Sequence, residues 1–264
     1  MAESDCTTEW RDAHCILRLT RPKKLNAITL AILDGLEECL DELDRGRARA
    51  LVIIGEGDRA FSSGTDLTES IGLDIGLDPD ANRAKVNRAR SLLLRLRRSP
   101  VTSIAALNGL AYGGGLELAL ACTFRMAAPG ARMALPEIKL GVLPAYGGTQ
   151  LLPAVIGASR ALDMMLTGRS VQPDEALAMG LINRLASDGA TLLDEALSFA
   201  GEVTDHSQCG IERIRRCVAA SGSRVTEAGL EVEGKAFEEM MESADAMEGV
   251  QAFFEKREPH FTHR

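Results

Sequence analysis

The sequence is short of the residues that build metal sites, disulfide frameworks and membrane spans. Its four histidines are scattered, with two among the last five residues, so we expect neither a Ser-His-Asp triad nor a histidine metal site. The six cysteines form no C-x-x-C pair, which favours free thiols in a reducing compartment over zinc ligands or disulfides. No apolar run approaches the roughly 18 residues that a membrane span needs.

Excess positive charge and a targeting signal are also lacking. A net charge of −8 over 264 residues argues against a nucleic-acid or anionic-membrane partner, although a local basic patch would still serve a small anionic ligand. Residues 1–11 lack the basic end and apolar run of a signal peptide, so we expect a cytoplasmic protein. With 45% apolar and 26% charged residues, the composition is that of a soluble globular chain.

Hydrophobic periodicity divides the chain into strand-plus-helix units followed by helices. Short apolar runs predict strands at 13–20, 50–54, 101–107, 124–128, 132–134 and 181–185. Helical spacing of apolar residues predicts helices at 29–45, 82–98, 114–121, 147–156, 159–167, 173–179, 190–204, 208–220, 225–243 and 246–257. This alternation favours an α/β fold with right-handed crossovers and helices that cover a sheet.

A run of three glycines, residues 113–115, separates a predicted strand from an apolar helix. Free N–H groups at a helix N-terminus suit an anion, including one that exists only in a transition state, although a tight turn alone would explain the glycines. Glu117 follows three residues after Gly114, in a helix that is apolar around most of its circumference. Because unpaired burial of a carboxylate is costly, Glu117 lies either at a solvent-facing rim or in a cleft.

Two other loops carry candidate residues that have simpler explanations when each is taken alone. Glu137 follows Pro136 and lies near Lys139, as an ordinary surface acid would. Asp66, in the loop 60–67, is typical of a residue that caps local backbone.

Taken together, these loops belong to a series of four motifs that follow one another along the chain. They are A-F-S-S-G-T-D-L at 60–67, N-G-L-A-Y-G-G-G-L-E-L-A at 108–119, P-E-I-K-L-G-V-L-P at 136–144 and G-G-T-Q at 147–150. This order resembles the enoyl-CoA hydratase/isomerase (crotonase) family. The resemblance runs from 19–27 to 248–257, nearly the whole chain.

The resemblance implies an α/β fold, a crotonase-like right-handed spiral of ββα turns with a C-terminal helical region. Residues 1–200 would form the spiral core domain with the acyl-CoA site. Residues 201–264 would form a helical oligomerisation region that builds a homotrimer or a dimer of trimers. The family needs no metal or redox cofactor, and coenzyme A is part of its substrate.

The same resemblance assigns roles to residues of the site. The backbone N–H groups of Thr65 and Gly114 would form an oxyanion hole for the thioester oxygen. Glu117 and Glu137 match the glutamate pair of family members that hydrate 2-enoyl-CoA. Glu117 would deprotonate the water that attacks the β-carbon, and Glu137 would protonate the α-carbon. Leu135 gives Glu137 an apolar neighbour, which favours a raised pKa, as an acid requires.

The coenzyme A moiety and the acyl group would contact further residues. Basic side chains are available where the family binds CoA, and each has a solvated surface cation as its simpler explanation. The CoA-binding candidates are Lys23, Lys24, Arg59, Ser63, Asp66 and Lys256, with Arg21 and Arg257 nearby. Ala145 and Tyr146 stand beside the acyl pocket, where familiar hydratases more often have Gly-Ala. They would displace the attacking water, shrink the pocket or donate a hydrogen bond.

The leading hypothesis is therefore an enoyl-CoA hydratase that adds water across the 2,3 double bond. Another crotonase-family reaction, by an isomerase, decarboxylase or thioester hydrolase, stays open because the fold alone does not choose among them. A non-catalytic acyl-CoA-binding protein would tolerate loss of the glutamates, so finding both argues against it. An RNA-binding role would require a basic stripe, which the acidic balance disfavours.

Overall fold

The structure, a computed structural model, describes residues 4–69, 79–205 and 244–260, together with positions 211, 214, 215, 227, 238, 241 and 242. The predicted helices at 208–220 and 225–243 lie largely outside the described residues. In the described part of the chain, no helix combines the length and the apolar character needed to cross a bilayer.

Two sheets form the framework. The larger has the order β1-β2-β3-β5-β7-β9, with only the β1–β2 pair antiparallel. Its strands are β1 (Cys6–Arg11), β2 (His14–Leu19), β3 (Ala50–Gly55), β5 (Thr102–Leu107), β7 (Phe124–Ala127) and β9 (Arg184–Leu185). The smaller is parallel, in the order β4-β6-β8, with β4 (Ala60–Ser62), β6 (Leu110–Tyr112) and β8 (Arg132–Ala134).

The chain alternates between these sheets in repeated turns. Each turn gives one strand to the large sheet, a short strand to the small sheet, and then a helix. The three turns are β3-β4-α2, β5-β6-α3 and β7-β8-α4, where α2 is Pro79–Arg98, α3 is Gly114–Ala121 and α4 is Gly148–Ile156. The predicted spiral of ββα turns is confirmed, and it brings the loops that follow the short strands to one side of the molecule.

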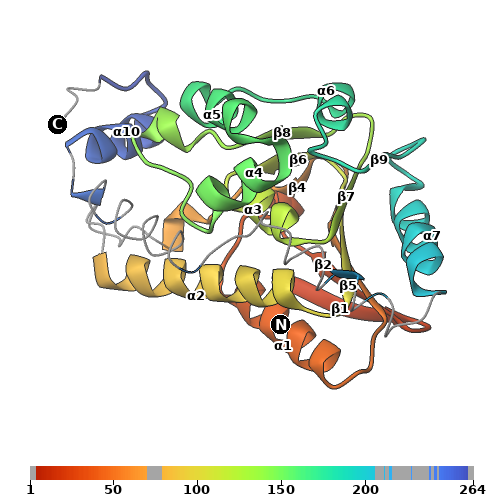
Figure 1. Cartoon of the computed structure of the whole chain (residues 1–264). Helices are drawn as coiled ribbons and strands as arrows, with labels where there is room; N and C mark the ends of the chain where they lie inside the picture. The colour runs from red at the N-terminus through yellow and green to blue at the C-terminus, as the bar shows by residue number, and fades with distance from the viewer. Residues whose placement is uncertain are drawn as a thin grey trace.

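Strand β3 shows why both faces of the large sheet are covered. Successive side chains of a strand point to opposite faces. Leu51 and Ile53 belong to the core that includes α1 (Leu30–Asp44) and α2. Val52 and Ile54 belong to a second core, with α7 (Leu192–Thr204). Helix α7 accordingly lies across the sheet from α1 and α2 (Figure 1).

The remaining elements complete the part of the molecule that carries the site. Helices α5 (Ala158–Thr167) and α6 (Pro173–Ala178) follow α4, and α10 (Ala244–Glu255) packs against the 3-10 helix η3 (Glu137–Leu140). Gly249 makes this contact possible, since a Cβ there would lie 2.1 Å from the Leu140 carbonyl oxygen. The other 3-10 helices are η1 (Pro22–Lys24) and η2 (Leu67–Glu69).

Candidate active site

Two loops of the spiral touch each other next to the N-terminus of α3. Gly64 (φ +104°) follows β4, and Gly113 (φ +52°) links β6 to α3. These backbone angles are disfavoured for side chains with a Cβ. A Cβ on Gly64 would also lie only 3.3 Å from the Gly114 nitrogen, so glycine allows the loops to meet.

The contact leaves two N–H groups without acceptors. Thr65 pairs with Ile28 through a parallel bridge that uses the Gly64 carbonyl and the Asp66 N–H, not the Thr65 N–H. Gly114 begins α3, so its N–H has no intrahelical acceptor and carries the positive end of the helix dipole. Within the described residues, neither N–H donates a hydrogen bond. Two such donors side by side suit an oxygen that gains negative charge.

Glu117 lies one turn into α3 and is 2% exposed. Its Oε1 accepts hydrogen bonds from two backbone N–H groups, those of Tyr146 at 2.8 Å and Gly148 at 2.7 Å. These charge-assisted bonds offset the cost of burying the carboxylate. Glu117 therefore also fixes the loop between η3 and α4.

Glu137 approaches the same place from the first residue of η3. Its Oε1 is 3.0 Å from the position that a Cβ on Gly113 would occupy. A cavity of about 170 Å³ is lined by Glu137, Glu117, Thr65 and Gly114 together. The structure thus brings the predicted oxyanion donors and both predicted acids to one cavity.

Ala145 and Tyr146, the residues that depart from the familiar Gly-Ala pair, also line this cavity. The Tyr146 ring lies against Gly114, with Cδ2 and Cε2 each 3.0 Å from the position of a Cβ on that glycine. Burial raises the pKa of the Tyr146 hydroxyl, while the neighbouring Thr65 hydroxyl opposes this rise. The phenol is consequently neutral over the physiological pH range.

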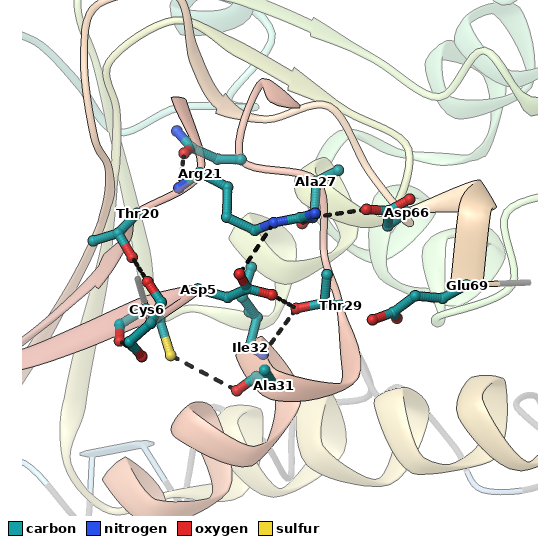
Figure 2. A network of polar contacts seen from close by, with 12 residues as sticks. Asp5, Cys6, Thr20, Arg21, Ala27, Thr29, Ala31, Ile32, Asp66 and Glu69 are labelled. Atoms are coloured by element: carbon teal, nitrogen blue, oxygen red, sulfur yellow. Dashed lines mark hydrogen bonds and ion pairs between the residues drawn. The ribbon is translucent and has the colours of Figure 1, made fainter. Parts of the chain in front are cut away.

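The loop that carries Thr65 is anchored by an ion-pair network at the first loop of the chain (Figure 2). Arg21 lies between two carboxylates, with Nη1 2.8 Å from Asp66 and Nε 3.3 Å from Asp5. Asp66 also accepts a hydrogen bond from the backbone N–H of Thr68 at 3.0 Å, which confirms its capping of local backbone. Burial would raise the pKa of Asp66, but the bonds from Thr68 and Arg21 bring it below its ordinary value.

The predicted CoA-binding residues divide into three groups. Ser63 lines the cavity, whereas Asp66 is 7% exposed and engaged in the network with Arg21. Lys23, Lys24, Arg59 and Lys256 are exposed, lie outside the cavity lining and form no ion pair with the described residues. Their CoA contacts stay a prediction.

Sequence reasoning missed two polar residues of the cavity, Asn82 and Lys85 on α2. Lys85 is 5% exposed, and its Nζ is 2.8 Å from the Glu69 carboxylate. Both polar residues occupy the stripe of α2 that also carries Val86 and Ala89. A polar side chain on an otherwise apolar stripe is the signal that would have revealed them.

The two sheets wound in ββα turns, with a cavity where the loops meet, define the crotonase fold. A family model described as enoyl-CoA hydratase/isomerase matches residues 10–264. A probable enoyl-CoA hydratase of Bacillus subtilis is 39% identical over 238 residues, covering 89% of this chain and 90% of that protein. The solved structure of an enoyl-CoA hydratase from Bacillus anthracis is 31% identical, with a TM-score of 0.77 and coverage of 98% and 100%.

A carnitinyl-CoA hydratase from Mycobacterium avium is 29% identical, with a TM-score of 0.86 over the full length of both chains. The chain belongs to the enoyl-CoA hydratase/isomerase family, and it is an enzyme of that family.

Proposed function

We propose that this protein is an enoyl-CoA hydratase that adds water across the 2,3 double bond of a 2-enoyl-CoA thioester. The observation that carries the proposal is the presence of Glu117 and Glu137 at one cavity, beside two N–H groups that have no acceptor among the described residues. An isomerase, a decarboxylase or a thioester hydrolase of the same fold is the alternative.

Conjugate addition places negative charge on the thioester oxygen, and the N–H groups of Thr65 and Gly114 receive it. Loss of one such donor typically raises the barrier by about 3–4 kcal/mol. Glu117 takes a proton from the water that attacks the β-carbon, and Glu137 gives a proton to the α-carbon. Positioned acid–base catalysis of this kind contributes roughly 10²–10⁴-fold. This chemistry uses no metal or redox cofactor.

The CoA moiety would extend out of the cavity toward the surface cations. The predicted contacts for its phosphates are Lys23, Lys24, Arg59 and Lys256, because exposed cations that form no ion pair with any described residue are available to an anion. Ser63 would contact the part of the substrate at the cavity mouth. Asp66 would act on this region through the loop that it anchors, since its carboxylate is held by Arg21 and Thr68.

Self-association as a homotrimer or a dimer of trimers is part of the proposal, with 201–264 as the oligomerisation region. Large apolar side chains on the surface support it: Leu166 is 66% exposed on α5, and Phe253 and Phe254 are 53% and 50% exposed on α10. Exposed apolar clusters commonly mark protein interfaces. Light scattering coupled to size-exclusion chromatography checks the mass, and a monomer would refute this part.

A turnover assay tests the reaction. Hydration of crotonyl-CoA removes the conjugated double bond, so the absorbance of the enoyl thioester should fall and 3-hydroxybutanoyl-CoA should appear in the mass spectrum. Free thiol release would instead indicate a hydrolase, and a shifted double bond an isomerase. A panel of 2-enoyl-CoA thioesters that all remain unhydrated would refute the proposed reaction.

A further inference from the structure

One residue of the cavity, Tyr146, has a phenol hydroxyl without a hydrogen-bond partner in the part of the chain that the structure describes. Tyr146 is 3% exposed, and its Oη is buried without a hydrogen bond to any of the residues that the structure describes. The Thr65 hydroxyl lies close enough to oppose the rise in the Tyr146 pKa, but the two hydroxyls do not meet with the distance and angles of a hydrogen bond. A buried hydroxyl without a hydrogen bond lowers the stability of the fold, so the presence of tyrosine at position 146 calls for an explanation.

Two other polar side chains of the cavity do have partners in the structure. Lys85 is bonded to Glu69, and Glu117 accepts two backbone N–H groups. These groups are satisfied before any ligand binds. The Tyr146 hydroxyl has no hydrogen-bond partner among the described residues, as is also true of the N–H groups of Thr65 and Gly114, so a ligand in the cavity can supply one.

Packing explains the ring of Tyr146 but not its oxygen. The ring lies against Gly114, and the backbone N–H is fixed by Glu117. A phenylalanine would keep both contacts and would bury no unsatisfied group. Since the phenol is neutral, it offers one O–H donor to a ligand rather than a charge.

We propose that Tyr146 selects acyl-CoA thioesters whose acyl group carries an oxygen beyond the reacting carbons, to which its hydroxyl donates a hydrogen bond. The proposal rests on the proposed function, in which the α- and β-carbons face Glu117 and Glu137. The recognised oxygen, a hydroxyl or a carbonyl, therefore belongs to the γ-carbon or to a later position.

Binding of two isosteric, saturated ligands, which have no double bond to hydrate, tests this selection without turnover. The ligands are 4-hydroxybutanoyl-CoA and pentanoyl-CoA, which differ by a hydroxyl in place of a methyl group. Isothermal titration calorimetry should give the wild type about tenfold tighter binding of the hydroxylated ligand, since a site that hydrogen-bonds a ligand oxygen rejects an analogue without it. In Tyr146→Phe the two dissociation constants should become equal within twofold.

The chain offers a matched control, because its only other tyrosine, Tyr112, lies outside the cavity lining. Tyr112→Phe should keep the wild-type preference. Thermal denaturation should show Tyr146→Phe to be at least as stable as the wild type, since the variant removes an unsatisfied buried hydroxyl.

Two results would overturn the inference: a wild-type preference below twofold, or an undiminished preference in Tyr146→Phe. Failure of the proposed function has a different signature. If the protein prefers the hydroxylated ligand through Tyr146 but hydrates no 2-enoyl-CoA, the proposed reaction is refuted and the inference about Tyr146 stands. If the protein hydrates crotonyl-CoA but binds both ligands equally, the proposed reaction stands and the inference about Tyr146 is refuted.

Discussion

Replacing Glu117 by glutamine should separate its chemistry from its role in holding the loop 146–148. The glutamine oxygen can still accept the two backbone N–H groups that now bond Oε1, at 2.8 and 2.7 Å. The loop should therefore keep its position. The amide cannot take a proton from water, so kcat for crotonyl-CoA should fall by roughly 10²–10⁴-fold.

Glu117→Ala removes the acceptor as well as the base. Each buried N–H left without an acceptor costs about 1–3 kcal/mol, so the two together should lower the free energy of unfolding by about 2–6 kcal/mol. Urea unfolding curves measure this difference, with Glu117→Gln as the matched control. The glutamine variant should unfold near the wild-type midpoint and bind CoA thioesters normally.

Two results would refute this reasoning. A Glu117→Gln enzyme that keeps more than a tenth of wild-type kcat would show that Glu117 is not the base. An alanine variant as stable as the glutamine variant would show that the bonds to Tyr146 and Gly148 do not hold the loop.

The remaining predictions concern the second acid, the CoA cations and the anchored loop. Glu137→Gln should lower kcat by roughly 10²–10⁴-fold with unchanged CoA binding, and retention of activity would remove its role as the acid. Lys23→Ala combined with Lys24→Ala should raise KM several-fold at unchanged kcat, in a manner that added salt weakens; a KM that does not move would place CoA elsewhere. Burial would raise the pKa of Asp66, but its hydrogen bonds lower it, so its contribution to stability is present above about pH 4 and lost as the pH falls further. Asp66→Asn should therefore be less stable at pH 7 and show a shallower loss in acid, as chemical denaturation at each pH would reveal.

The sequence predicted elements whose patterns are strong and local. The continuous apolar run at 50–54 became β3, buried on both faces, and the cap at Thr29 was followed by α1 from Leu30. Strand β1 was missed because it lies at the edge of the sheet with a largely exposed, polar sequence. Strands β4 and β6 were also missed, and of the three short strands in the small sheet only β8 was predicted.

The features of the site also divide into those that the sequence predicted and those that it did not. The resemblance of the ordered motifs to the crotonase family implied that residues 65, 114, 117 and 137 gather at one site. The motifs did not reveal that Glu117 is bonded to residues 29 and 31 positions away, or that the Tyr146 hydroxyl is buried without a partner among the described residues. Those features depend on how the η3–α4 loop packs over α3, which no local pattern specifies.

A crystal structure of the complex with a 3-oxoacyl-CoA would test the oxyanion site most directly. The thioester oxygen should lie about 2.9 Å from the backbone nitrogens of both Thr65 and Gly114, with Glu117 and Glu137 flanking the adjacent carbons. A thioester oxygen that is bonded to neither nitrogen, or an acyl group bound away from the two carboxylates, would contradict the account.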